Sequence, residues 1–218
     1  MGLLIRKDFV LTSAHCVRSN DGKKLKATVL SSASFKGDVS TENITKVHNE
    51  NRVYYTQQVQ EITTHNRYLQ KPRVHDIALL RVNPAPSVGR WKFSPMLLPK
   101  LINKDFCESN VDKQFKFVGL KFSSSAVLIE EKARIVPHNR CDTDDKTLTF
   151  CARISTKADD THFGSDCRFS GLLVDDRGVL LGTFIENVYD KNGLYSGSKF
   201  VNVSAHIPWI SKELNKRE

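Results

Sequence analysis

The chain has 218 residues, of which 39% are hydrophobic and 26% are charged, values that are ordinary for a soluble globular protein. A chain of this length forms one or two domains and can bury roughly 70% of the surface that its unfolded form exposes. The composition excludes a disordered or collagen-like chain. The sequence contains no internal repeat and no apolar stretch long enough to span a bilayer, so we expect no membrane partner.

The formal net charge of +9 raises the question of a nucleic-acid or heparin partner. Lysines and arginines are spread along the chain, and their densest group, Lys23, Lys24 and Lys26, is short and has no aromatic residue between its members. A solvated basic surface explains this pattern better than a nucleic-acid interface. We therefore predict no nucleic-acid partner and only a weak, salt-sensitive attraction to acidic surfaces.

Five cysteines in a chain of this size indicate an oxidising compartment. No run with the spacing C-x-x-C or H-E-x-x-H is present, so we predict neither a metal nor another cofactor. The histidines outside the motifs described below are scattered and are expected at the surface or at strand ends: His48, His65, His138, His162 and His206. Glycosylation sequons occur at Asn43 and Asn202, and Asn43, in a polar stretch, is the predicted acceptor.

In chain order, short apolar and β-branched runs alternate with polar turn clusters. The predicted strands cover residues 9–12, 26–30, 77–82, 115–118, 126–129 and 179–185. A polar, proline-bearing stretch at residues 83–99 indicates an interdomain connection. Residues 207–214 are predicted to form a helix capped by Ser204, with Ile207, Ile210 and Leu214 on one face. This pattern favours an all-β sandwich or barrel.

Three short motifs carry the chemistry. Residues 12–16 read Thr-Ser-Ala-His-Cys, residues 75–80 read His-Asp-Ile-Ala-Leu-Leu, and residues 169–174 read Phe-Ser-Gly-Leu-Leu-Val. A serine hydroxyl is a poor nucleophile until an imidazole takes its proton, and a buried carboxylate must hold that imidazole in the right tautomer. The order histidine, aspartate, serine therefore points to acyl-transfer chemistry.

These motifs, with the segments at residues 2–5, 61–68, 178–182, 199–203 and 207–210, resemble the chymotrypsin-like serine protease family over nearly the whole chain. The resemblance implies two antiparallel six-stranded Greek-key β-barrels and a C-terminal helix. Residues 1–90 would form the N-terminal barrel and residues 91–218 the C-terminal barrel and helix. Because the chain begins in the middle of a strand and has no signal peptide, we expect a truncated N-terminal barrel and an incomplete N-terminus.

By this resemblance His15 holds the general-base position, Asp76 the orienting position and Ser170 the nucleophile position. The alternative for all three is an inherited scaffold residue with no present chemistry. The family's nucleophile loop, Gly-Asp-Ser-Gly-Gly-Pro, places the serine four positions after a cysteine, whereas only two residues separate Cys167 from Ser170. The missing residue corresponds to an oxyanion-hole glycine, and losing one such donor costs about 10²–10³ in turnover.

Further departures concern activation and the substrate cleft. Phe169 replaces the acidic residue that, in the family, pairs with the new N-terminus after activation cleavage. The substrate-pairing Ser-Trp-Gly strand aligns with residues 185–187, and the family's Gly-Trp-Gly turn is reduced to residues 119–121. The resemblance places the substrate pocket at Ser165, Asp166 and Ser198. Asp166 is an acidic candidate for a basic substrate side chain, or simply surface charge, so no cleavage specificity is predicted.

The resemblance also implies a disulfide between Cys141 and Cys151, which would contribute about 2–3 kcal/mol through loop closure. Cys16 would pair with a cysteine upstream of this chain. Cys107 and Cys167 lack their usual partners, since Asp175 stands where one would be, and nothing in the sequence decides whether they pair with each other.

We therefore predict a secreted, monomeric, non-catalytic serine protease homologue that binds a protein partner in an extracellular protease cascade. The first alternative is an active trypsin-like endopeptidase acting on protein substrates, because all three triad side chains are retained. The second is a fragment or a defective gene model that lacks the first strand of the N-terminal barrel.

Overall fold

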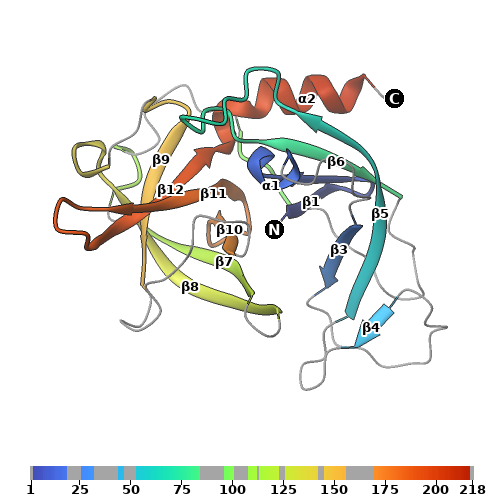
Figure 1. Cartoon of the computed structure of the whole chain (residues 1–218), viewed down its shortest axis with the longest axis horizontal. Helices are drawn as coiled ribbons and strands as arrows, with labels where there is room; N and C mark the ends of the chain where they lie inside the picture. Colours follow the sequence, from blue (N-terminus) through green and yellow to red (C-terminus); the bar gives the residue numbers. More distant parts are fainter. Residues whose placement is uncertain are drawn as a thin grey trace.

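The computed structural model describes residues 2–18, 26–31, 44–46, 53–83, 96–100, 108–111, 113–122, 126–141, 145–155 and 169–216. Within these residues the N-terminal half forms one antiparallel sheet (Figure 1). Its strands lie in the order β1 (Gly2–Arg6), β2 (Phe9–Thr12), β6 (Ala78–Val82), β5 (Val53–Thr64) and β3 (Lys26–Ser31), and β4 (Ile44–Lys46) pairs with β5. The predicted strands at residues 9–12 and 77–82 are thus central to this sheet.

The C-terminal half is a closed six-stranded antiparallel barrel, which Figure 1 shows beside the N-terminal sheet. Its strands follow one another around the barrel as β7 (Gln114–Phe122), β8 (Ala126–Val136), β9 (Thr149–Ile154), β12 (Tyr195–Asn202), β11 (Leu180–Tyr189) and β10 (Phe169–Val174), which pairs again with β7. Closure leaves this sheet no exposed edge. Residues 119–121, aligned with a family turn, lie inside β7, opposite residues 127–129 of β8.

The described residues also form short helices: α1 (Ala14–Arg18), η1 (His138–Arg140), η3 (Val203–His206) and α2 (Ile207–Asn215). The predicted C-terminal helix is confirmed, and Ile207, Ile210 and Leu214 pack on one apolar cluster. The prediction that Ser204 caps it is wrong. Ser204 lies inside η3, where its N–H and hydroxyl both donate to the Asn202 side chain, and α2 begins after His206 without a side-chain cap.

Phenylalanine rings fill the barrel interior. Phe117, Phe150, Phe184 and Phe200 are each at most 1% exposed, and Phe200 contacts the other three rings at centroid distances of 5.7–6.1 Å. Gly171 on β10 faces the Phe117 ring so closely that a β-carbon there would overlap it. The absence of a side chain at Gly171 thus leaves the space that the Phe117 ring occupies.

A second apolar cluster joins the sheet to the barrel. Its buried members from the sheet side are Phe9, Leu11, Ile77 and Leu79, and those from the barrel and helix side are Leu172, Val174, Leu180, Ile185, Val201, Val203 and Ile210. Hydrogen bonds cross the same boundary: Ser13 Oγ donates to the Phe184 carbonyl (3.0 Å), and Arg73 Nη1 donates to the Ile185 carbonyl (2.9 Å). The two halves are thus held together by a continuous core, which fixes α1 and the start of β6 at their junction (Figure 1).

The predicted disulfide between Cys141 and Cys151 is confirmed, with the two Cα atoms 5.8 Å apart. Asn43, Cys107 and Cys167 lie outside the described residues. Asn202, the second sequon, is 7% exposed and its side chain donates to the Thr147 carbonyl, so a glycan does not fit there. Among the described residues no helix has the length and apolar character needed to cross a membrane.

Candidate active site

Two of the three sequence-predicted side chains meet at the junction of the two halves. His15 is the second residue of α1, directly after the buried strand β2, and Asp76 immediately precedes the buried residues Ile77 and Ala78 at the start of β6. Strands β2 and β6 are neighbours, and Thr12 pairs with Ala78. This register brings the ends of the two strands together and with them the histidine and the aspartate.

The Asp76 carboxylate holds His15 through two hydrogen bonds. The backbone N–H of His15 donates to Asp76 Oδ1 (2.7 Å), and His15 Nδ1 lies 2.5 Å from Asp76 Oδ2. The Asp76 side chain is fully buried and that of His15 is 8% exposed. Because a carboxylate accepts the bond, Nδ1 carries the proton and Nε2 keeps its lone pair in the neutral ring.

The lone pair on His15 Nε2 is the one that takes the serine proton in triad chemistry. In this structure Cys16 Sγ lies 3.3 Å from His15 Nε2. The histidine is therefore in the tautomer of a general base, but its basic nitrogen faces the neighbouring cysteine. Because Cys16 follows His15 directly, the sequence could have indicated this contact. The resemblance instead assigned Cys16 only to a disulfide.

Ser170 lies in strand β10, where its Cα pairs with that of Leu120 on β7. The residue is 2% exposed. Among the described residues no hydrogen bond joins Ser170 to His15. A nucleophilic serine must present its hydroxyl both to the base and to a substrate carbonyl, whereas Ser170 is a buried strand residue of the barrel wall. Residues 156–168, which contain most of the shortened loop, lie outside the described residues.

Of the three residues predicted to form the substrate pocket, the structure describes Ser198. Ser198 is fully buried, its hydroxyl donates to Asn187 Oδ1 (2.8 Å), and Tyr195 Oη lies 2.9 Å from it. Burial is the main cause that raises the pKa of Tyr195, so this hydroxyl stays protonated at neutral pH. Hydrogen-bonding groups of the protein thus surround the Ser198 hydroxyl, while Ser165 and Asp166 lie outside the described residues.

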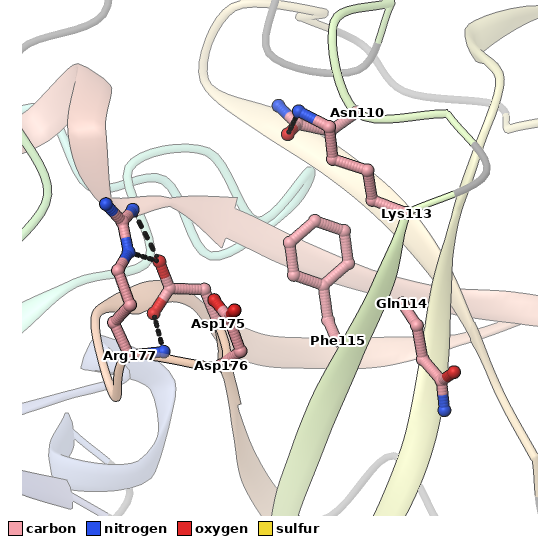
Figure 2. A pocket seen from close by; sticks show the side chains of 7 residues that line it. All are labelled: Asn110, Lys113, Gln114, Phe115, Asp175, Asp176 and Arg177. Atoms are coloured by element: carbon pink, nitrogen blue, oxygen red, sulfur yellow. Dashed lines mark hydrogen bonds and ion pairs between the residues drawn. The ribbon is translucent and has the colours of Figure 1, made fainter.

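A cavity of about 550 Å³ lies elsewhere on the barrel. Asn110, Lys113, Gln114, Phe115, Asp175, Asp176 and Arg177 line it. Figure 2 shows Phe115 between the Asp175–Arg177 pair on one side and Asn110 and Lys113 on the other. Asp175 accepts from the Arg177 and Val179 amides (3.0 and 2.8 Å) and from the Arg177 guanidinium (2.8 and 3.1 Å). Its carboxylate thus organises the β10–β11 turn, and neither His15 nor Asp76 lines this cavity.

An antiparallel barrel packed against a second β-sheet, with a histidine–aspartate pair at their junction, is the scaffold of a chymotrypsin-like serine protease. The family model described as Trypsin matches residues 1–165, and the chain therefore belongs to the trypsin family. The match includes His15 and Asp76 and ends before Ser170.

Comparison with solved structures supports the fold. A granzyme structure, "Structure of GrC", is 20% identical, with a TM-score of 0.67 over 98% of this chain and 86% of that chain. Kallikrein-related peptidase 10 is 18% identical, with a TM-score of 0.62 over 99% of this chain and 89% of that chain. At these identities the likeness extends to the fold alone.

Proposed function

We propose that the protein is a secreted, non-catalytic serine protease homologue that regulates an extracellular protease cascade by binding a protein partner. The observation that carries this proposal is the placement of Ser170 within β10, 2% exposed, while His15 Nε2 faces Cys16 Sγ. A nucleophile and its base must lie within hydrogen-bond reach for proton transfer. The disulfide between Cys141 and Cys151 supports an oxidising, extracellular location.

Three departures in the sequence support the same proposal. The segment from Cys167 to Ser170 is one residue shorter than the family's, which removes an oxyanion-hole donor. Phe169 cannot form the ion pair that the family uses for activation. Ser198, at the pocket position, is buried and hydrogen-bonded to Asn187. These changes affect the nucleophile, activation and substrate binding separately, so repair of one would not restore turnover.

One observation favours an active trypsin-like endopeptidase as the second candidate. The Asp76–His15 pair keeps the buried carboxylate, the 2.5 Å contact and the tautomer that a triad needs. For this candidate Ser170 would have to leave its strand position on substrate binding. The pair also has a structural use, because Asp76 accepts the His15 backbone N–H at the start of α1.

A paired assay separates the two candidates. The full chain and its Ser170→Ala variant are tested for turnover of a fluorogenic peptide library, and for their effect on the rate at which a purified trypsin-like protease cleaves a protein substrate. The proposal predicts no turnover by either form and an equal change of that rate by both. Peptide turnover that disappears in Ser170→Ala would establish the endopeptidase instead. The absence of any effect on the active protease would remove the regulatory part of the proposal.

A further inference from the structure

Three histidines that are distant in sequence meet beside Asp76. His65 follows the end of β5, His75 directly precedes Asp76, and His206 ends η3. Each offers one ring nitrogen, and these nitrogens all lie within 4.8 Å of one another. The sequence-based expectation of a surface position is wrong for His65 and His206, which are 9% and 2% exposed, whereas the alternative of a strand-end position holds for His65, which follows β5.

The hydrogen bonds around His206 aim its Nε2 at the centre of this cluster. His206 Nδ1 donates to the Asn202 carbonyl (2.8 Å), and because a carbonyl only accepts, Nε2 keeps its lone pair. His206 Nε2 lies 3.1 Å from His75 Nδ1. A backbone carbonyl that orients one ring nitrogen while the other is left as a donor is the usual outer-shell arrangement of a metal-bound histidine.

The ring positions are fixed by packing. His65 and His75 stack at a centroid distance of 4.3 Å with 7° between their planes, and the Trp209 ring lies 5.0 Å from His65. The backbone of His75 has φ of +51°, a strained conformation for a residue other than glycine and one that clusters at ligand sites. The neighbouring chain therefore holds the His75 ring in the cluster against a backbone preference.

Burial keeps these rings neutral. It is the main cause that lowers the pKa of His65 and of His206 to about 4, and the neighbouring histidines lower both values further. The pKa of His75 is also lowered, mainly by burial. The Arg67 guanidinium also lowers the pKa of His65 and of His75, whereas the Asp145 carboxylate acts on His75 and His206 in the opposite direction, so the cluster lies near one charge of each sign. Neutral imidazoles are the protonation state in which histidine binds a divalent cation.

We infer that His65, His75 and His206 form a binding site for a divalent late transition metal, with Zn²⁺ as the ion that best fits three imidazoles. Nitrogen ligands about 2.0–2.1 Å from a tetrahedral zinc ion lie about 3.4 Å from one another. The pair formed by His75 and His206 already has nearly this spacing. His65 would move by about 1–1.5 Å from the 4.8 Å limit and would give up the hydrogen bond that its Nδ1 accepts from the Arg67 N–H (3.2 Å). The ion would take the place of the proton that His75 Nδ1 shares with His206 Nε2, and His75 would carry that proton on its Nε2 instead, so that the ring stays neutral.

The site would join three parts of the fold: the end of β5, the segment before β6 and the start of α2. Because His75 is bonded to Asp76, a bound ion would fix the peptide that carries the carboxylate holding His15. This inference does not depend on whether Ser170 reacts, since no nucleophile takes part in it.

The test is a calorimetric titration of the metal-free full chain with zinc chloride. We expect one zinc ion per chain, binding weakened by about 100-fold or more in His75→Asn and in His65→Phe, and unchanged binding in His138→Ala, a histidine of η1 on the barrel. Asparagine tolerates the left-handed backbone of residue 75, and phenylalanine keeps a ring against Trp209. Failure of the wild-type chain to bind zinc, or binding that survives both cluster variants, would overturn the inference.

A second measurement needs no variant and so remains decisive if the substitutions prevent folding. Ring-nitrogen NMR shifts of the wild-type histidines are followed as zinc chloride is added. The signals of His65, His75 and His206 should move together and saturate at one equivalent, while the signal of His138 stays in place. Saturation with the three cluster signals unmoved would place the ion elsewhere and refute the site.

Discussion

The contribution of Asp76 to stability can be tested by the substitution Asp76→Ala. The carboxylate is fully buried and accepts two hydrogen bonds from His15, one from the backbone N–H and one from the ring. Alanine leaves both donors without their acceptor at the junction between the sheet and the barrel. If the pair is retained for the fold rather than for turnover, its loss must appear as lost stability.

The magnitude follows from the two orphaned donors. A buried donor left without a partner costs about 1–3 kcal/mol, so two donors cost about 2–6 kcal/mol. Removing the desolvated carboxylate offsets part of this cost. We therefore expect Asp76→Ala to lower the free energy of unfolding by about 2–4 kcal/mol. Asp76→Asn keeps one acceptor oxygen for the His15 amide and should cost less than Asp76→Ala.

Urea denaturation followed by circular dichroism measures the effect, with the midpoint and the slope fitted separately. The control is Asp176→Ala, which removes an exposed aspartate of the β10–β11 turn and should change stability by at most about 0.5 kcal/mol. A loss of less than about 1 kcal/mol in Asp76→Ala, similar to that in Asp176→Ala, would refute the structural role of the pair.

Three further predictions concern the barrel. Gly171→Ala should lower the free energy of unfolding by about 1–3 kcal/mol, because its β-carbon would overlap the Phe117 ring. In the same urea assay Gly197→Ala, whose new β-carbon would have its nearest contact at 3.4 Å, should lower it by less. Replacing Cys141 and Cys151 together by alanine should lower stability by about 2–3 kcal/mol, since the bond closes a short loop, and equal urea midpoints would contradict this. Burial opposes the lowering of the Asp175 pKa, but hydrogen bonds from Val179 and Arg177 outweigh it. The stabilisation is therefore complete above the unfolded pKa, near about 4, and is lost as the pH falls through the lower folded value. Asp175→Asn should thus destabilise more at pH 7 than at about pH 3, and a difference independent of pH would show that the charge has no part in it.

The strands were predictable from the sequence because their signals are local. Residues 9–12 and 77–82 are runs of apolar and β-branched residues, and both became buried strands. The pairing of His15 with Asp76 spans 61 residues and came only from the resemblance, since no local pattern encodes a contact at that distance.

Other features depended on competition between neighbouring groups. The cap at Ser204 was predicted wrongly because Asn202, two residues earlier, supplies the side-chain oxygen that begins η3, and the helix proper starts later.

The histidine cluster could not be predicted from spacing. The segment between β5 and β6 brings His65 and His75 together. His206, the third member, lies 131 residues after His75 in the sequence.

The reactivity of Ser170 is the most direct measure of the central claim. The folded full chain is incubated with a fluorophosphonate probe, which forms a covalent bond only with an activated serine, and its intact mass is recorded beside that of Ser170→Ala. A buried serine in β10 should leave both masses unchanged. A mass increase of one probe in the wild-type chain, absent from Ser170→Ala, would contradict the account and identify a working nucleophile.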